Sequence, residues 1–309
     1  MSAVTRVLVV GGDSRAARAF RRVVAKDPAV VVSVLVRRAT VAGPREIVHR
    51  IDDYFSPPAA ILADTDALIN FVGSPNGSSA TLFDLNAAGP ERLAKAAKAG
   101  GARHFIQISS LSIFGPAEDI YFDTLLLPHS AYGHSKLAAE ERLSALADDL
   151  FLVSLVRAPL IYGPDGGGKL TLLRNVFTRT PLFPVPPILE PRSMIHVDNL
   201  AFALLDVIKA RAGGATFACD PQPFDLGRFA EGLRASGRPA PRLVIFPSEF
   251  FAILRRMAPN IHASLYGRSL VHDPGSLPQT TTALPLDKAL QDVIDGGRRG
   301  KSERSRTPG

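Results

Sequence analysis

The chain has 309 residues, a length that suits one large α/β domain or a domain with an appendage. With 46% hydrophobic and 21% charged residues it can bury a sizeable core, and its single cysteine excludes an intrachain disulfide framework and fits a reducing compartment. The net charge of +7 does not by itself indicate nucleic-acid binding, because much of the excess lies in 296–309, a basic tail that we expect to be disordered.

The ends and the composition also exclude some classes of protein. The N-terminus enters a strand directly and lacks the apolar core and cleavage site of a signal peptide. No apolar run reaches the ~18 residues that a bilayer-spanning helix needs. The histidines are scattered, so no metal site is expected. We therefore expect a cytoplasmic protein with neither a membrane nor a nucleic-acid partner.

The first elements predict a β-α-β unit, the element that binds dinucleotides. A strand over 6–10 is followed by a turn at Gly11-Gly12-Asp13-Ser14, a helix over 15–26 and a second strand over 30–36. Counted from Gly12, the two later glycines of the dinucleotide fingerprint are replaced by Arg15 and Arg18. The helix N-terminus still favours an anion. Arg15 then either contacts the pyrophosphate or takes its place.

The second strand ends in Arg37-Arg38, where an acidic residue would hold a ribose 2′-hydroxyl. An arginine at this place accommodates a 2′-phosphate, which favours NADP(H). The alternative, that these are simply two solvated arginines after a strand, explains the pattern nearly as well.

The following segments continue the alternation of strands and helices. We expect strands over 45–51, 67–72, 102–108, 151–157 and 215–219. One helix is expected over 81–99, a second begins at residue 131, and a third ends at about residue 209. This order predicts a doubly wound parallel sheet, a Rossmann fold.

The most informative stretch joins the strand over 102–108 to the next helix. Ser109 and Ser110 end the strand, and Tyr132 and Lys136 lie one turn apart at the head of the helix, about 6 Å along its axis. An ammonium about 4 Å from the phenol would favour the phenolate by roughly 4 kcal/mol and bring the pKa of Tyr132 towards neutrality. Ser110 would fix the substrate oxygen, Tyr132 would move a proton and a nicotinamide would move the hydride.

Each part of this pattern is common alone: Tyr-x-x-x-Lys usually marks a solvated helix face, and Ser-Ser usually marks a turn. Their order within an α/β pattern favours the functional interpretation.

After residue 163 the sequence pattern becomes less regular. A glycine loop precedes an irregular, proline-rich stretch over 182–191, and beyond 221 we expect turns and two short helices over 224–235 and 248–257. We interpret the Phe250/Phe251/Ile253/Leu254 cluster as packing. The expected division is a dinucleotide-binding domain of 1–164 and 193–220, a substrate-binding region of 165–192 and 221–295, and the tail of 296–309.

The assembled pattern resembles the extended short-chain dehydrogenase/reductase family, the NAD-dependent epimerase/dehydratase group that acts on nucleotide sugars. The resemblance reaches to about residue 295. It depends on Gly-Gly at the first turn, Asn86, Ile-Ser-Ser-Leu-Ser-Ile-Phe-Gly, Tyr132-x-x-x-Lys136, Arg157-Ala-Pro-x-x-Tyr-Gly-Pro and Arg192-x-x-x-His-Val-Asp. It implies that Ser110, Tyr132 and Lys136 are catalytic, that Lys136 also holds the nicotinamide ribose, and that Arg192 approaches the substrate diphosphate. It also implies a homodimer through the helices that carry Asn86 and Tyr132. The expected contacts to NADP or NAD are Gly11, Gly12, Ser14, Arg15, Arg37, Asp53, Val72, Asn86, Tyr132, Lys136 and Pro159.

The sequence departs from the family's pattern at two further places, and the second of them excludes one class of reaction. The family's His-Leu-Ala-Ala after the fourth strand is here Asn-Phe-Val-Gly over 70–73, and the Asp-Glu pair of the 4,6-dehydratases is Leu111-Ser112. Dehydration needs an acid and a base at neighbouring carbons, so that subclass is excluded. We expect a 4-epimerase or a 4-keto reductase of a nucleotide-activated sugar, with Ser110 and Arg192 contacting the substrate. The alternative is a non-catalytic nucleotide-binding or scaffold protein on a degenerate Rossmann fold.

Overall fold

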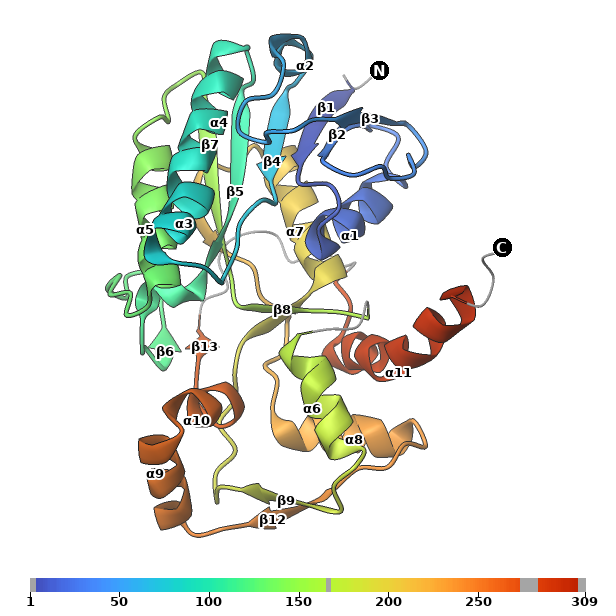
Figure 1. The fold of residues 1–309 in the computed structure, drawn as a ribbon, viewed down its shortest axis with the longest axis vertical. Helices are drawn as coiled ribbons and strands as arrows, with labels where there is room; N and C mark the ends of the chain where they lie inside the picture. The colour runs from blue at the N-terminus through green and yellow to red at the C-terminus, as the bar shows by residue number, and fades with distance from the viewer. Residues whose placement is uncertain (1–3, 165–167, 273–282, 305–309) are drawn as a thin grey trace.

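A parallel sheet of seven strands forms the centre of the computed structural model, which describes residues 4–164, 168–272 and 283–304 (Figure 1). From one edge to the other the strands are β11 (Gly214–Phe217), β7 (Leu152–Ala158), β5 (His104–Ser110), β4 (Ala67–Asn70), β1 (Thr5–Val10), β2 (Val30–Val36) and β3 (Glu46–Arg50). Every neighbouring pair is parallel. Strands of this kind are covered on both faces, which explains the Val-rich run of β2. The expected doubly wound sheet is confirmed.

Helices cover both faces of this sheet (Figure 1). One face packs against α1 (Arg15–Val24) and α7 (Val197–Ala210), with Phe20 and Leu200 fully buried in that core. The other packs against α2 (Ala59–Ala63), α4 (Gly89–Ala99) and α5 (Ala131–Ser144). Beside these lie α3 (Ser79–Phe83) and the π-helical turn η1 (Asp84–Ala88). Where the sequence predicts one helix over 81–99, the chain therefore forms three consecutive segments.

A second lobe lies below the carboxyl edge of the sheet (Figure 1). Its helices are α6 (Lys169–Phe177), α8 (Leu226–Ala235), α9 (Ser248–Met257), α10 (Pro259–Leu265) and α11 (Leu286–Arg304). They share a core with the β9 strand and the Tyr266 ring. Short parallel pairs complete the fold: β9 (Leu182–Val185) with β12 (Arg242–Ile245), β8 (Leu160–Tyr162) with β10 (Met194–His196), and β6 (Asp119–Ile120) with β13 (Leu270–Val271). The 3-10 turn η2 (Leu111–Phe114) follows β5.

The helix α11 continues through Arg304, and 305–309 lie outside the described residues, so the disorder expected over 296–309 stays a prediction. The helix is anchored by a buried apolar face that starts at Leu286. The aromatic cluster of α9 is only partly packing, because Phe251 is buried whereas Phe250 and Ile253 are exposed.

None of the described helices is long and apolar enough to cross a bilayer.

Candidate active site

Most of the predicted site residues, though not Arg192, follow strands at the carboxyl edge of the sheet. Strand order reverses between β1 and β4, and in open α/β sheets ligands bind at such a switch point. The turn of 11–14 follows β1, the loop of 71–74 follows β4, η2 follows β5 and Pro159 follows β7. Five of the expected segments therefore meet at one edge, counting Tyr132 and Lys136 at the head of α5.

The glycine turn has a backbone that only glycine fits. Gly11 has φ +80°, and a β-carbon there would lie 2.9 Å from Val72 Cγ2. A β-carbon on Gly12 would lie 2.1 Å from Val34 Cγ1, so the turn presses directly on β2. Ser14 is the N-cap of α1 and accepts a hydrogen bond from the Ala17 amide at 3.2 Å. No acidic side chain lies in the first turn of the helix, which leaves its positive end available to an anion.

This geometry corrects the count of the fingerprint. The glycine with positive φ is Gly11, and counted from it the two later positions are Ser14 and Ala17 rather than Arg15 and Arg18. Both are small, and Ala17 is fully buried against the sheet. Close helix packing is therefore kept, and Arg15 is an addition at the helix start. Its guanidinium extends to the second lobe, where a β-carbon at Gly168 would lie 3.7 Å from Nη1.

Arg37 lies at the carboxyl end of β2 and is exposed. Its amide donates to the Tyr54 hydroxyl at 3.1 Å, and its guanidinium carbon lies 5.2 Å from the centre of the Tyr54 ring. Asp53, one residue earlier, is exposed and accepts from the Phe55 amide at 2.9 Å. Tyr54 was not among the sequence-predicted residues, since nothing in its local pattern connects it to β2.

The three expected catalytic side chains come together. Ser110, the last residue of β5, is a hydrogen-bond partner of Tyr132. Lys136 Nζ lies 5.8 Å from the centre of the Tyr132 ring and donates to the Ile108 carbonyl at 3.0 Å. Gly133 makes this approach possible, because a β-carbon there would lie 2.5 Å from the Ser112 carbonyl oxygen. That glycine is a site feature that the sequence reasoning missed.

The pKa shifts differ from the sequence expectation. Burial raises the pKa of Tyr132, and the hydrogen bond with Ser110 opposes the rise only in part. Burial lowers the pKa of Lys136 to about 8, with the Glu140 carboxylate acting in the opposite direction. The expectation that Lys136 brings the pKa of Tyr132 towards neutrality is therefore wrong for this structure: desolvation of the phenol outweighs the hydrogen bond with Ser110, the group that lowers this pKa.

Asn86 connects three parts of the site. Its amide nitrogen donates to the Ser74 carbonyl and to Ser135 Oγ, both at 2.9 Å, and its oxygen accepts from the Ser74 amide at 2.9 Å. It therefore fixes the loop after β4 against α5. A β-carbon on Gly73 would lie 2.9 Å from the Asn86 oxygen and 3.5 Å from Lys136 Nζ. The Gly73 backbone is thus close to the predicted nicotinamide-ribose ligand.

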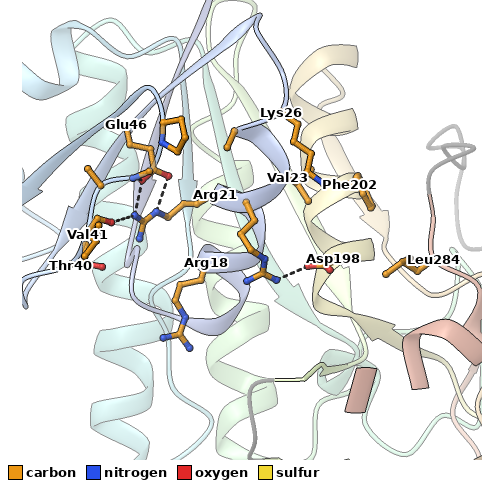
Figure 2. A pocket seen from close by; sticks show the side chains of 15 residues that line it. Arg18, Arg21, Val23, Lys26, Thr40, Val41, Glu46, Asp198, Phe202 and Leu284 are labelled. Carbon is orange, nitrogen blue, oxygen red and sulfur yellow. Dashed lines mark hydrogen bonds and ion pairs between the residues drawn. The ribbon is translucent and has the colours of Figure 1, made fainter. Parts of the chain in front are cut away.

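Two pockets lie beside the site. The first, of about 930 Å³, runs along α1 between the loop of 40–44 and α7 (Figure 2). Figure 2 shows Arg21 turned towards Glu46, to which it donates at 2.7 Å. Arg22 donates to Asp198 at 2.8 Å. No residue of the trio lines this hollow.

The second pocket, of about 510 Å³, lies in the second lobe and contains Arg192. Its lining is apolar except for Lys169, Arg192 and Ser264. Arg192 donates to the carbonyl oxygens of Ser264 at 2.6 Å, Ala263 at 2.7 Å and Gly267 at 2.5 Å. Its guanidinium thus caps the end of α10 while lining the pocket, and it is not in the cluster formed by the trio.

One group of possible metal ligands occurs among the described residues: His196, Asp198 and Asp292, whose ligand atoms lie within 4.8 Å of one another. His196 Nδ1 accepts from the Asp198 amide at 3.3 Å, so Nε2 carries the proton and offers no lone pair. Arg22 already pairs with Asp198. The donor set does not fit a metal ion.

Comparisons with known proteins place this chain in a family and match its fold. The sequence profile described as the NAD dependent epimerase/dehydratase family matches residues 7–219. The uncharacterized protein y4nL of Sinorhizobium fredii is 30% identical over 178 residues, 55% of this chain and 50% of that protein. A UDP-glucose 4-epimerase of Vibrio cholerae is 31% identical over 140 residues, 41% of each chain. The alignments therefore span half or less of these curated relatives.

Two solved structures share the fold across nearly the whole chain. A UDP-glucuronic acid 4-epimerase from Bacillus cereus in complex with NAD superposes with a TM-score of 0.73 at 14% identity, covering 96% of this chain and 99% of that one. The human epimerase family protein SDR39U1 with NADPH gives 0.70 at 19% identity, covering 94% and 99%.

Proposed function

The chain belongs to the NAD dependent epimerase/dehydratase family, and we propose that it is an enzyme of the extended short-chain dehydrogenase/reductase type. The proposed reaction is NAD(P)-dependent hydride transfer at C4 of a nucleotide-activated sugar, as a 4-epimerase or a 4-keto reductase. The observation that carries the proposal is the meeting of Ser110, Tyr132 and Lys136 beside the glycine turn.

The residues at the switch point fit a dinucleotide. The Gly11-Gly12 backbone and the capped start of α1 offer amide donors to a pyrophosphate, with Arg15 beside them. Lys136 and the loop after β4, which Asn86 fixes beside it, would hold the nicotinamide ribose. Arg37, which follows β2, and Asp53, in the loop after β3, would contact the adenosine half. A bound nicotinamide would supply or accept the hydride.

The protein residues handle the proton and the orientation. Ser110 would hydrogen-bond the substrate oxygen, and Tyr132 would give its hydroxyl proton to that oxygen, or take one from it. The Lys136 ammonium, close to the phenol ring, would stabilise the phenolate left behind. Leu111 is buried and Ser112 carries no charge, so nothing after Ser110 supplies the acid–base pair of a dehydratase.

The substrate region remains a proposal as well. We assign cofactor binding to 1–164 and 193–220, and substrate binding to 165–192 and 221–295. The apolar pocket with Lys169 and Arg192 would receive the part of the substrate away from the reacting carbon. The B. cereus and V. cholerae proteins, which are named as 4-epimerases of UDP-sugars, support a nucleotide-activated sugar. A homodimer through the helical segments that carry Asn86 (η1) and Tyr132 (α5) is proposed on the family resemblance.

The test is turnover of a panel of UDP- and dTDP-sugars and their 4-keto forms, followed by NMR of the products with NAD⁺, NADH and NADPH. Tyr132→Phe should lose at least about 10²–10⁴-fold in turnover, because it lacks the proton donor while keeping the ring. Tyr121→Phe, which changes a phenol that is 47% exposed, is the matched control. Near-normal turnover by Tyr132→Phe would refute the assignment.

A further inference from the structure

Three consecutive residues at the end of β5 each contact a different position on α5. The Ile108 carbonyl accepts from Lys136 Nζ at 3.0 Å, Ser109 Oγ donates to Glu140 Oε1 at 2.5 Å, and Ser110 is the partner of Tyr132. Two of these contacts belong to the proposed catalytic trio. The contact of Ser109 with Glu140 has no assigned role.

Glu140 is a buried charge held by a buried cation. Its side chain is 5% exposed and that of Arg157 is 9% exposed. Arg157 Nε donates to Glu140 Oε1 at 3.2 Å, and its terminal nitrogen donates to Oε2 at 2.8 Å. In the sheet register Arg157 on β7 stands beside Ser109 on β5, so Glu140 fastens α5 to two strands at once.

Such a pair is costly to bury, and stability alone rarely explains it. Desolvation of two ions offsets most of their mutual attraction, and hydrophobic replacements are often at least as stable. We therefore test whether the Glu140–Arg157 pair fixes the geometry or the charge of the neighbouring site, rather than whether it stabilises the fold.

The neighbouring charge is the Lys136 ammonium, one helical turn before Glu140 and on the same face. Burial lowers the pKa of Lys136 to about 8, and the Glu140 carboxylate raises it. The charged and titratable groups around Lys136 are Tyr132 and Glu140 on α5 and, behind Glu140, Arg157 on β7. The loop after β4 and η1 present the uncharged Gly73 and Asn86.

We propose that Glu140 is a positioning residue for the proposed reaction: clamped by Ser109 and Arg157, it fixes α5 against the end of β5 and holds a negative charge one turn from Lys136. It touches neither substrate nor cofactor and acts through Lys136 and Tyr132. The proposal rests on the function assigned to that trio.

The first test follows Lys136 directly by NMR of ¹³Cε/¹⁵Nζ-labelled lysine, assigned with a Lys136→Met variant. Glu140→Gln alone would leave Arg157 unpaired and could fail to fold, so the decisive variant is Glu140→Gln/Arg157→Gln, whose two amides can bond each other. Its Lys136 midpoint should lie below that of the wild type, because Glu140 is the nearer charge and its loss outweighs the loss of Arg157 behind it. Glu141→Gln, an exposed change at the next residue, should leave the midpoint in place. An unchanged midpoint in the folded double variant would overturn the proposal.

The second test separates positioning from folding. With the substrate found by the panel, the double variant should lose roughly tenfold in kcat while its KM changes little, and its pH profile should move with the Lys136 midpoint. Glu140→Asp keeps the negative charge. Its Lys136 midpoint should therefore lie closer to that of the wild type than the midpoint of the double variant does. A loss of kcat without any shift of the pH profile would reduce Glu140 to a structural role.

The two proposals fail in different ways. Active Tyr132→Phe would refute the trio whatever Lys136 does, whereas an unshifted Lys136 midpoint would refute the role of Glu140 and leave the trio in place.

Discussion

At Gly12 the glycine turn has no room for a side chain. A β-carbon there would meet Val34 Cγ1 at 2.1 Å, and the β-branched Val34 cannot swing away. We expect Gly12→Ala to destabilise the protein by about 1–3 kcal/mol, as overpacked cores do. Urea unfolding followed by circular dichroism would measure the loss.

The matched control is Gly213→Ala. A β-carbon at Gly213 would meet its nearest atoms at 3.6 and 3.7 Å, which is ordinary contact. An equal loss in both variants would show that the tight approach of the turn to β2 does not determine the cost.

His104 makes the stability depend on pH. Burial lowers the pKa of His104 to about 4 from the usual 6.5. Ser154 gives its proton to the Ala212 carbonyl, so the neutral His104 Nε2 donates to Ser154. Because the unfolded chain then binds more protons between these two values, stability falls as pH drops through that window. The free energy of unfolding should be lower by about 2 kcal/mol at pH 5 than at pH 7.5.

His104→Gln should flatten this dependence. If its stability falls between the two pH values as much as that of the wild type, another group is responsible.

The candidate site residues that the sequence predicts share a local signal. Tyr132 and Lys136 are one turn apart, and Ser110 ends a strand, so spacing alone brings them near one edge. Tyr54, Gly133 and Glu140 act through contacts with distant strands or turns, which no local spacing shows. The count of the glycine fingerprint from Gly12 begins one residue too late. The Gly-Gly pair does not show which glycine comes first, whereas the positive φ of Gly11 in the structure does.

At the scale of elements, periodicity located the segments that are packed along their whole length. The strand over 30–36 matches β2 at both ends, because its valines are buried on both faces. The expected helix over 81–99 is helical throughout, but it contains the π turn η1 just before Pro90, which lies in the first turn of α4 and has no backbone amide to donate. The β9/β12 pair was missed since its two strands are far apart in sequence and join only in the folded chain.

The C-terminal helix α11 is stabilised by burial rather than by its own sequence. Leu290 is 2% exposed, in the same core as Leu286 and Ile294. We expect Leu290→Ala to cost about 2–5 kcal/mol of unfolding free energy, from lost transfer energy plus the cavity. Leu150→Ala, at a side chain that is 83% exposed, should stay within ~0.5 kcal/mol. Similar small losses in denaturant melts of both variants would mean that α11 does not contribute to the core.

At the scale of the whole molecule, the sheet gathers at one edge groups that are far apart in sequence. The turn after β1, the end of β2, the loop after β4 and the head of α5 all open towards the second lobe (Figure 1). The alternation of strands and helices predicted this sheet, and with it the edge where the site lies. How the second lobe closes over that edge depends on contacts such as Arg192 with the α10 carbonyls, which the sequence pattern does not encode.

The dinucleotide decides between an enzyme and a scaffold, and isothermal titration of cofactor-free protein with NADPH and NADH is the test. Arg37, stacked on Tyr54 at the end of β2, is placed to meet a 2′-phosphate. One charge-assisted hydrogen bond contributes roughly 1.5–3 kcal/mol, so we expect a dissociation constant for NADPH near the micromolar range and at least about tenfold weaker binding of NADH. Arg37→Ala/Arg38→Ala should remove this preference, whereas Arg103→Ala, at the amino end of β5, should keep it. Equal binding of both cofactors by the wild type would make the two arginines bystanders. Binding of neither would favour the scaffold, because Tyr132 and Lys136 would then have no hydride partner.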